Sequence, residues 1–220
     1  MTTPAQRRYE QVVAARSAAQ ADPDGSMEGA SAYEMQLARL ATDKRRLHDI
    51  QSIERKIEVK RELLPGYDTW VSGVLSDGRG AQDDVLVTVM VWHIDVGNFD
   101  EALRIAHYVL RHGLALPDQY QRNAATVLVD EITDAALVVQ KDPAGRFPLQ
   151  LLQETQTLTD AHDMPDQARA KLHRALGAEY QAAGDLRAAL QHYQRALALN
   201  PKAGVKRYIT ELEAALKSAG

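Results

Sequence analysis

The stretch RAKLHRALGAEYQAAGDLRAALQHYQRALALNP, residues 169–201, decides the fold. Its apolar residues recur at steps of three and four, which is the period of an amphipathic helix. Gly184 and Asp185 interrupt the pattern near its middle, and Pro201 ends it because proline cannot continue a helix. The stretch therefore predicts two consecutive helices that pack against each other.

Small residues stand at the two points where these helices would cross, and this spacing resembles a tetratricopeptide repeat. Gly177 and Ala189 would let the two backbones approach closely. His173 stands where that family usually has tryptophan. The positions that match the repeat pattern are Leu176, Gly177, Tyr180, Ala189, Tyr193, Ala196 and Pro201.

An earlier stretch, GNFDEALRIAHYVLRHGLALP at residues 97–117, echoes the second helix of this pair. The helix before it lacks the small residue and the tyrosine, so it is a degenerate repeat at most. Tandem repeats usually bind proteins, but a single helix pair cannot form their extended groove. Both a structural helix pair and a partner-binding surface therefore remain open interpretations of the C-terminal stretch.

The rest of the chain also predicts helices, because leucine, alanine and glutamine are abundant and aromatic residues make up only 5%. We predict an all-α fold. Residues 81–96 are the ambiguous segment, since their β-branched residues would also suit a buried strand. Asp83 and Asp84 favour a buried helix there, because acidic residues stabilise the first turn of a helix. Besides the repeat pair, helices are expected over residues 4–19, 31–64, 68–75, 81–96, 122–141 and 148–161, and from Asn98 onward.

The longest predicted helix covers residues 31–64 and begins with a capping box of Ser31 and Glu34. Its narrow apolar stripe is typical of a helical hairpin or a coiled-coil contact. Pro65-Gly66 ends it, and the polar stretch at residues 22–26 is predicted to connect it to the first helix. We divide the chain into three regions, 1–64, 65–163 and 164–220.

Charge is segregated along the chain beneath a net charge of -4. Residues 1–61 carry 11 basic and 9 acidic groups, and residues 171–220 carry 8 basic and 4 acidic groups. The middle is acidic. A nucleic-acid interface depends on a local basic patch rather than on the total charge. The two ends of the chain are therefore the candidate regions for binding an anionic polymer.

Basic residues are densest on the long predicted helix, where residues 36–61 hold 8 basic and 4 acidic groups. Such cations can neutralise DNA phosphates and release counterions. The alternative is a solvated helix with ion pairs at one turn's spacing, such as Glu58 with Arg61. The predicted DNA-binding residues are Arg7, Arg8, Arg16, Lys44, Arg45, Arg46, Arg55, Lys56, Lys60 and Arg61.

Composition and motifs exclude several classes of function. The chain has no cysteine, so no disulfide framework or cysteine nucleophile is expected. No apolar run approaches the roughly 20 residues that cross a bilayer, and the first ten residues lack the apolar core of a signal peptide. No phosphate-loop motif, nucleophile elbow or helical histidine pair occurs. We expect a cytoplasmic protein with no cofactor, no metal site and no membrane contact.

Several motifs outside the repeat resemble the small terminase subunits (the GpM family) of temperate contractile-tailed phages with cohesive genome ends. They are TTPAQRR at residues 2–8, KRELLP at 60–65, GRGAQDD at 78–84 and ARAKLH at 168–173. The resemblance implies a homo-oligomeric ring in the host cytoplasm. This ring would bind double-stranded viral DNA at the cohesive-end site and recruit the terminase large subunit, which holds the packaging ATPase and the nuclease.

None of these motifs is a catalytic signature, so we expect no enzymatic activity in this chain. The main alternative is an endonuclease that holds divalent metal ions between carboxylates near a glycine turn. Its candidate residues are Asp77, Asp83, Asp84 and Asp95. Asp83 and Asp84 are adjacent, so on a helix they would point about 100° apart. A helical-repeat scaffold that binds no DNA is the second alternative, although it leaves the basic helix unexplained.

Overall fold

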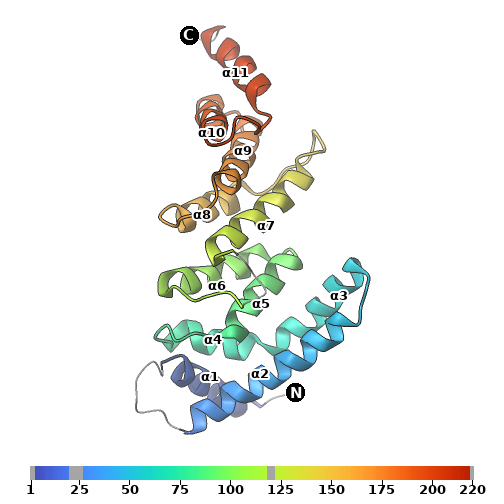
Figure 1. Ribbon diagram of the computed structural model, residues 1–220, viewed down its shortest axis with the longest axis vertical. Helices are drawn as coiled ribbons and strands as arrows, with labels where there is room; N and C mark the ends of the chain where they lie inside the picture. Colours follow the sequence, from blue (N-terminus) through green and yellow to red (C-terminus); the bar gives the residue numbers. More distant parts are fainter. Residues whose placement is uncertain (1–2, 20–26, 118–121, 219–220) are drawn as a thin grey trace. The chain divides into compact units, whose positions relative to one another are not determined.

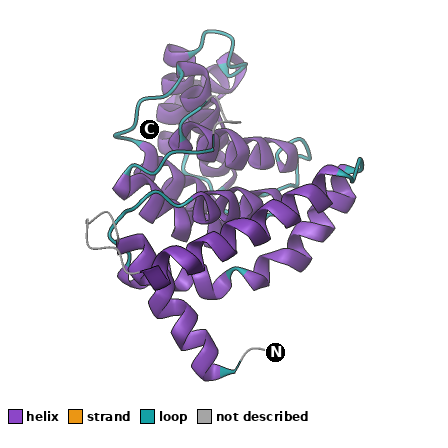
Figure 2. Cartoon of the chain, turned by 60° about the horizontal axis from the view of Figure 1, so that its bottom comes forward, coloured by secondary structure: helices purple, strands orange, loops and turns teal. Residues whose placement is uncertain are grey.

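The computed structural model describes residues 3–19, 27–117 and 122–218 (Figure 1). Within these ranges the regular secondary structure is helical and no strand occurs (Figure 2), which confirms the all-α prediction. None of the described helices has the length and apolarity that crossing a membrane requires. The chain forms two compact units, Met1–Ala124 and Ala125–Gly220. These boundaries differ from the three regions drawn from the sequence, whose division of function stays a prediction.

The first unit is built from six helices and one short 3-10 turn within its described residues. They are α1 (Pro4–Ala19), α2 (Met27–His48), α3 (Ile53–Leu63), η1 (Leu64–Gly66), α4 (Asp68–Asp77), α5 (Asp84–Asp95) and α6 (Phe99–His112). Helix α1 packs against α4, where an added Cβ on Gly73 would lie 2.4 Å from the carbonyl oxygen of Gln11. Gly73 therefore allows the two helices to approach closely.

The long predicted helix over residues 31–64 is wrong as a single element. Helix α2 begins before Ser31, so this serine cannot cap it, and the helix is broken over residues 49–52. Ser52 then caps α3, because its side chain accepts a hydrogen bond from the backbone nitrogen of Arg55 at 3.3 Å. Serine satisfies free N–H groups at helix starts better than it continues a helix. The predicted connector at residues 22–26 lies outside the described residues.

Helix α5 confirms the buried helix predicted within residues 81–96, and it lies in the core of the first unit. Every residue from Val85 to Ile94 is buried. Asp83 caps the helix by accepting a hydrogen bond from the backbone nitrogen of Leu86 at 2.8 Å, and it accepts a second from Nε1 of Trp70 at 2.8 Å. Burial on all sides thus overrides the strand preference of the β-branched residues.

The second unit contains the predicted repeat. Its helices are α7 (Ala124–Val139), α8 (Leu149–Thr159), α9 (Asp166–Ala182), α10 (Leu186–Leu199) and α11 (Lys206–Ser218). An added Cβ on Gly177 of α9 would lie 2.7 Å from Cδ1 of Tyr193 on α10. Leu176, Ala189 and Ala196 are buried around this crossing. Tyr180 is half-buried at its edge, and Pro201 follows the end of α10.

Candidate nucleic-acid interface

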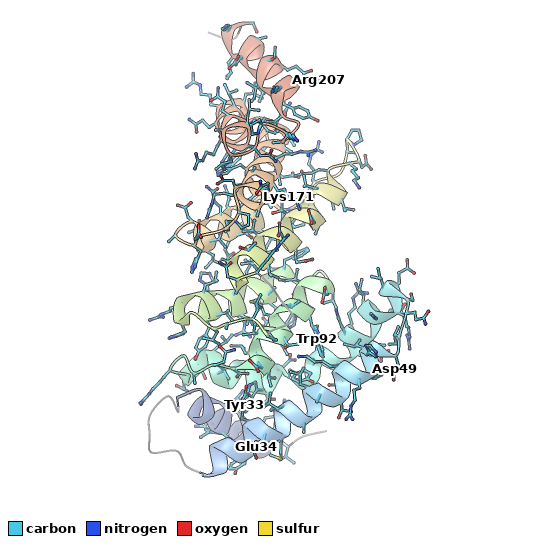
Figure 3. All side chains as sticks on the ribbon, viewed as in Figure 1. Tyr33, Glu34, Asp49, Trp92, Lys171 and Arg207 are labelled. Atoms are coloured by element: carbon cyan, nitrogen blue, oxygen red, sulfur yellow. The ribbon has the colours of Figure 1, made fainter. Side chains whose placement is uncertain are left out.

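The break between α2 and α3 borders a cavity of about 600 Å³, which we call the basic cleft. Figure 3 labels two of its residues, Asp49 directly after α2 and Trp92 on the buried helix α5. Helices α2, α3 and α5 all contribute lining residues. These residues are Lys44, Arg45, Leu47, His48, Asp49, Lys56, Lys60, Thr88, Trp92 and Asp95.

Positive charge predominates in the basic cleft, which four lysine and arginine residues line together with two aspartates. Nζ of Lys60 donates a hydrogen bond to the carboxylate of Asp95 and forms an ion pair with it. Burial lowers the pKa of Lys44, an effect that the carboxylate of Asp84 opposes. Lys56 forms no ion pair with any of the described residues. An anion in the cleft would therefore meet Lys56 without a competing ion pair, whereas Asp95 already neutralises Lys60.

The structure divides the predicted DNA-binding residues into two groups. Lys44, Arg45, Lys56 and Lys60 line the basic cleft together. The remaining cations on α2 and α3 lie outside the cleft lining, and each has a protein partner. Arg46 pairs with Glu62 at 2.9 Å, Arg55 pairs with Glu58 at 2.7 Å, and Arg61 donates to the carbonyl oxygen of Val96 at 3.3 Å.

Three of the predicted DNA-binding residues belong to α1. Arg7 and Arg8 are exposed on this helix and do not line the cleft. Arg16 belongs to the same helix, but its side chain lies outside what the structure describes. DNA binding by any member of the predicted set stays a prediction.

Sequence reasoning missed half of the cleft, including His48, Asp49, Thr88 and Trp92. Trp92 is held by the core, where its ring meets that of Tyr67 edge-on with 5.9 Å between the centroids. The Tyr67 hydroxyl in turn donates to Asp43 at 2.6 Å. The exposed polar residues Asp49, Gln51 and Ser52 were the available signal for the break that brings these residues together.

The four aspartates of the predicted metal site do not form a cluster. Asp83 is buried as the cap of α5, and this burial raises its pKa to about 6. Asp95 pairs with Lys60, and Asp84 accepts a hydrogen bond from Nε2 of Gln82 at 2.9 Å. Asp77 accepts one from the neighbouring Ser76 hydroxyl at 3.2 Å. Across the described ranges, no group of three or more histidine, cysteine or acidic residues is placed to hold a metal ion.

The described part of the chain thus combines an all-helical fold with a cavity that four cations line. The chain belongs to the phage small terminase subunit family, whose model matches residues 37–167. A tetratricopeptide repeat model matches residues 170–203, in agreement with the helix pair α9–α10.

Two relatives carry related names. The chain is 45% identical over 219 residues to the terminase, endonuclease subunit, of Escherichia phage P2, an alignment that covers 99% of this chain and 87% of that protein. It is 29% identical over 168 residues to the probable terminase, endonuclease subunit, of Haemophilus phage HP1, covering 70% of this chain and 59% of that protein. No solved structure matches the chain.

The prediction that this chain is not an enzyme is contradicted by these names, since both relatives are described as endonuclease subunits. The prediction rested on the lack of a recognised catalytic motif. That criterion was wrong because side chains distant in sequence can form a catalytic group without leaving a local pattern.

Proposed function

We propose that this chain is the endonuclease subunit of a phage terminase, and that it holds viral DNA through the basic cleft during cutting. The observation that carries the proposal is the 45% identity, over 99% of this chain, to the terminase endonuclease subunit of Escherichia phage P2. The family match over residues 37–167 supports it and includes the whole cleft.

The cations of the cleft supply the physical basis for DNA binding. Arg45 is exposed at the cleft and its guanidinium donates to the Thr42 hydroxyl at 3.2 Å, so no carboxylate neutralises it there. Lys44 is partly desolvated and gains more from an anionic partner than a fully solvated lysine does. A duplex laid across α2 and α3 would exchange its counterions for these side chains.

We further propose that the chain works in the host cytoplasm as a homo-oligomeric ring at the cohesive-end site. A ring would repeat the basic cleft around its axis, so modest contacts would add through avidity. The terminase large subunit is the second protein partner. The helix pair α9–α10 and the exposed face of α11 are the surfaces that we assign to contacts between subunits or with the large subunit.

Cleavage in a reconstituted terminase tests the enzymatic part of the proposal. Linear DNA that contains the cohesive-end site is incubated with magnesium and with this chain, the large subunit, or both. We expect specific cutting in the reactions that contain this chain and none with the large subunit alone. Equal cutting at the same site by the large subunit alone would contradict the proposal.

Charge reversal in the cleft tests the DNA contact within that same reaction. The triple variant Lys44→Glu, Arg45→Glu, Lys56→Glu should lose duplex binding and cutting, because three unneutralised cations become anions. The matched control reverses the exposed cations Lys202, Lys206 and Arg207 of the second unit, with the same change in net charge. An effect on the control as large as that on the cleft variant would move the DNA contact to the C-terminal end.

Two aspartates near the cleft allow the chemistry to be located. Asp84→Asn and Asp95→Asn are suitable because neither residue caps a helix with its side chain, whereas Asp83 does. Loss of cutting with unchanged duplex binding in either variant would assign that carboxylate to the cleavage step. Unchanged cutting in both variants would exclude these two aspartates from the cleavage step. The cleft would then be assigned to DNA binding alone.

A further inference from the structure

A buried hydroxyl lies in the wall of the basic cleft. Thr88 of α5 lines the cleft with a side chain that is 1% exposed, and among the described residues its Oγ1 has no hydrogen-bond partner. Three other buried threonines, Thr133, Thr155 and Thr159, each donate to the carbonyl four residues earlier, as Thr159 does to Thr155 at 2.7 Å. A buried hydroxyl without a partner costs stability, so its retention needs an explanation.

An oxygen-rich ligand in the cleft would supply the missing partner. Threonine in a helix divides between two χ1 rotamers, which exchange the positions of its hydroxyl and methyl groups. The side chain of Thr88 lines the cleft, so a change of rotamer lets its hydroxyl meet a ligand there without movement of the backbone. The same cavity is lined by four cations and by two carboxylates, those of Asp49 and Asp95. Asp95 neutralises Lys60, so the remaining excess of positive charge, which includes Lys44 and Lys56, favours an anion over a neutral ligand.

The size of the cleft limits what can reach Thr88. A volume of about 600 Å³ lies in the range of pockets that hold one small ligand. A duplex is far too wide to enter it and would meet only the cations at the rim. A single nucleotide at the end of an unpaired strand fits, and a terminal phosphate monoester brings more negative charge and more free oxygens than an internal diester.

We infer that the basic cleft receives the phosphorylated end of a single DNA strand, with the terminal phosphate between the cleft lysines and the Thr88 hydroxyl. This inference rests on the proposed function, because a terminase endonuclease generates strand ends beside its own binding surface. The cleft then distinguishes a cut end from the continuous duplex.

Strand-end binding is measured with three internally labelled single strands of one sequence. One carries a 5′-phosphate, one a 3′-phosphate, and one hydroxyls at both ends. We expect one phosphorylated strand to bind about tenfold more tightly than the hydroxyl-ended strand, the effect of one additional charge-assisted hydrogen bond. Equal affinity for all three strands would overturn the inference.

Thr88→Val keeps the shape of the side chain and removes the hydroxyl. The free variant should be at least as stable as the natural chain, because a buried hydroxyl without a partner is lost. The variant should bind the phosphorylated strand and the hydroxyl-ended strand with about equal affinity. The control Thr133→Val removes a buried hydroxyl that donates to the Val129 carbonyl, and it should retain the preference. A preference that survives in Thr88→Val would overturn the inference.

Two further measurements separate the possible outcomes. Duplex binding of the natural chain tests the proposed function, so intact duplex binding with no strand preference refutes the strand-end inference alone. Absent duplex binding refutes the proposed DNA contact instead. Inorganic phosphate should displace the phosphorylated strand only at concentrations far above those of a competing phosphorylated strand. Equal competition would assign the cleft to free phosphate and overturn the strand-end assignment.

Discussion

The helix pair α9–α10 and the broken pair α2–α3 show two ways in which sequence specifies structure. At the α9–α10 crossing, Gly177 faces the ring of Tyr193 so closely that no other residue type fits without movement. At the α2–α3 break, Asp49 and Ser52 are exposed and polar, and the chain changes direction with little buried surface. The tightly packed crossing was predictable residue by residue, whereas the break was not.

The two regions also differ in whether they contain the candidate site. The α9–α10 crossing borders a cavity of about 380 Å³, whose lining includes Glu179 and Tyr193. The break opens a larger cleft of about 600 Å³ between α2, α3 and α5, and four cations line it. Cations that would otherwise follow one solvated helix face are thereby gathered around one cavity. The weakly specified region therefore carries the candidate site, and the strongly specified region supports the fold.

Truncation of Tyr193 should give the largest difference between the two regions. Tyr193→Ala removes a fully buried ring from the α9–α10 crossing and should lower the free energy of unfolding by about 3–5 kcal/mol. The control Ile53→Ala lies in α3, where the side chain is 75% exposed, and should change it by less than about 0.5 kcal/mol. Urea unfolding followed by circular dichroism measures both. Comparable losses of stability in Tyr193→Ala and Ile53→Ala would mean that the α9–α10 crossing is no more tightly packed than α3.

Lowering the pH should stabilise the first unit through Asp83 and destabilise the second unit through His173. Burial raises the pKa of Asp83 from 3.8 to about 6, so the folded first unit holds a proton that the unfolded chain releases. Its contribution is complete below pH 3.8 and is lost as the pH rises through 6. The shift corresponds to about 2–3 kcal/mol. In the natural chain the free energy of unfolding should therefore fall as the pH rises from 3.8 to 6, and Asp83→Asn should remove that fall.

His173 should produce the reverse dependence in the second unit. Burial, and then the neighbouring His192, lower its pKa from 6.5 to about 4, and Nδ1 of each ring lies 2.9 Å from that of the other. Its contribution is complete above pH 6.5 and is lost as the pH falls through 4. The free energy of unfolding should therefore rise between pH 4 and pH 6.5, and His173→Gln should flatten that rise. Unfolding curves from pH 4 to pH 7 compare the variants, and parallel profiles would contradict both assignments.

Loss of the α3 cap should have the smallest effect. Ser52→Ala removes the side chain that accepts a hydrogen bond from the Arg55 backbone nitrogen and should cost about 0.5–1 kcal/mol. Hydrogen exchange in the first turn of α3 measures this change locally, and Ser52→Asp, which retains a capping oxygen, is the control. Faster exchange in both variants would mean that the cap does not define the break.

The sequence predicted what depends on local periodicity and close packing. The repeat positions around Gly177 are the example, because only a small residue fits where the two helices cross. The buried helix at 81–96 was predicted from the acidic residues Asp83 and Asp84 at its start, since its β-branched residues would equally suit a strand. It missed the break at 49–52, since polar surface residues are compatible with either a continuous or an interrupted helix. Thr88 and Trp92 could not be assigned to the cleft without that break. The relatives' names, rather than a motif, correct the expectation of no enzyme.

The salt dependence of duplex binding tests the central claim, that the cleft cations contact DNA, most directly. Affinity is measured across a salt series for the natural chain and for Lys44→Gln, Arg45→Gln, Lys56→Gln. Each phosphate contact contributes about 0.9 to the slope of log affinity against log salt, so the triple variant should flatten the slope by about 2 to 3. An unchanged slope and affinity in the variant would contradict the claim.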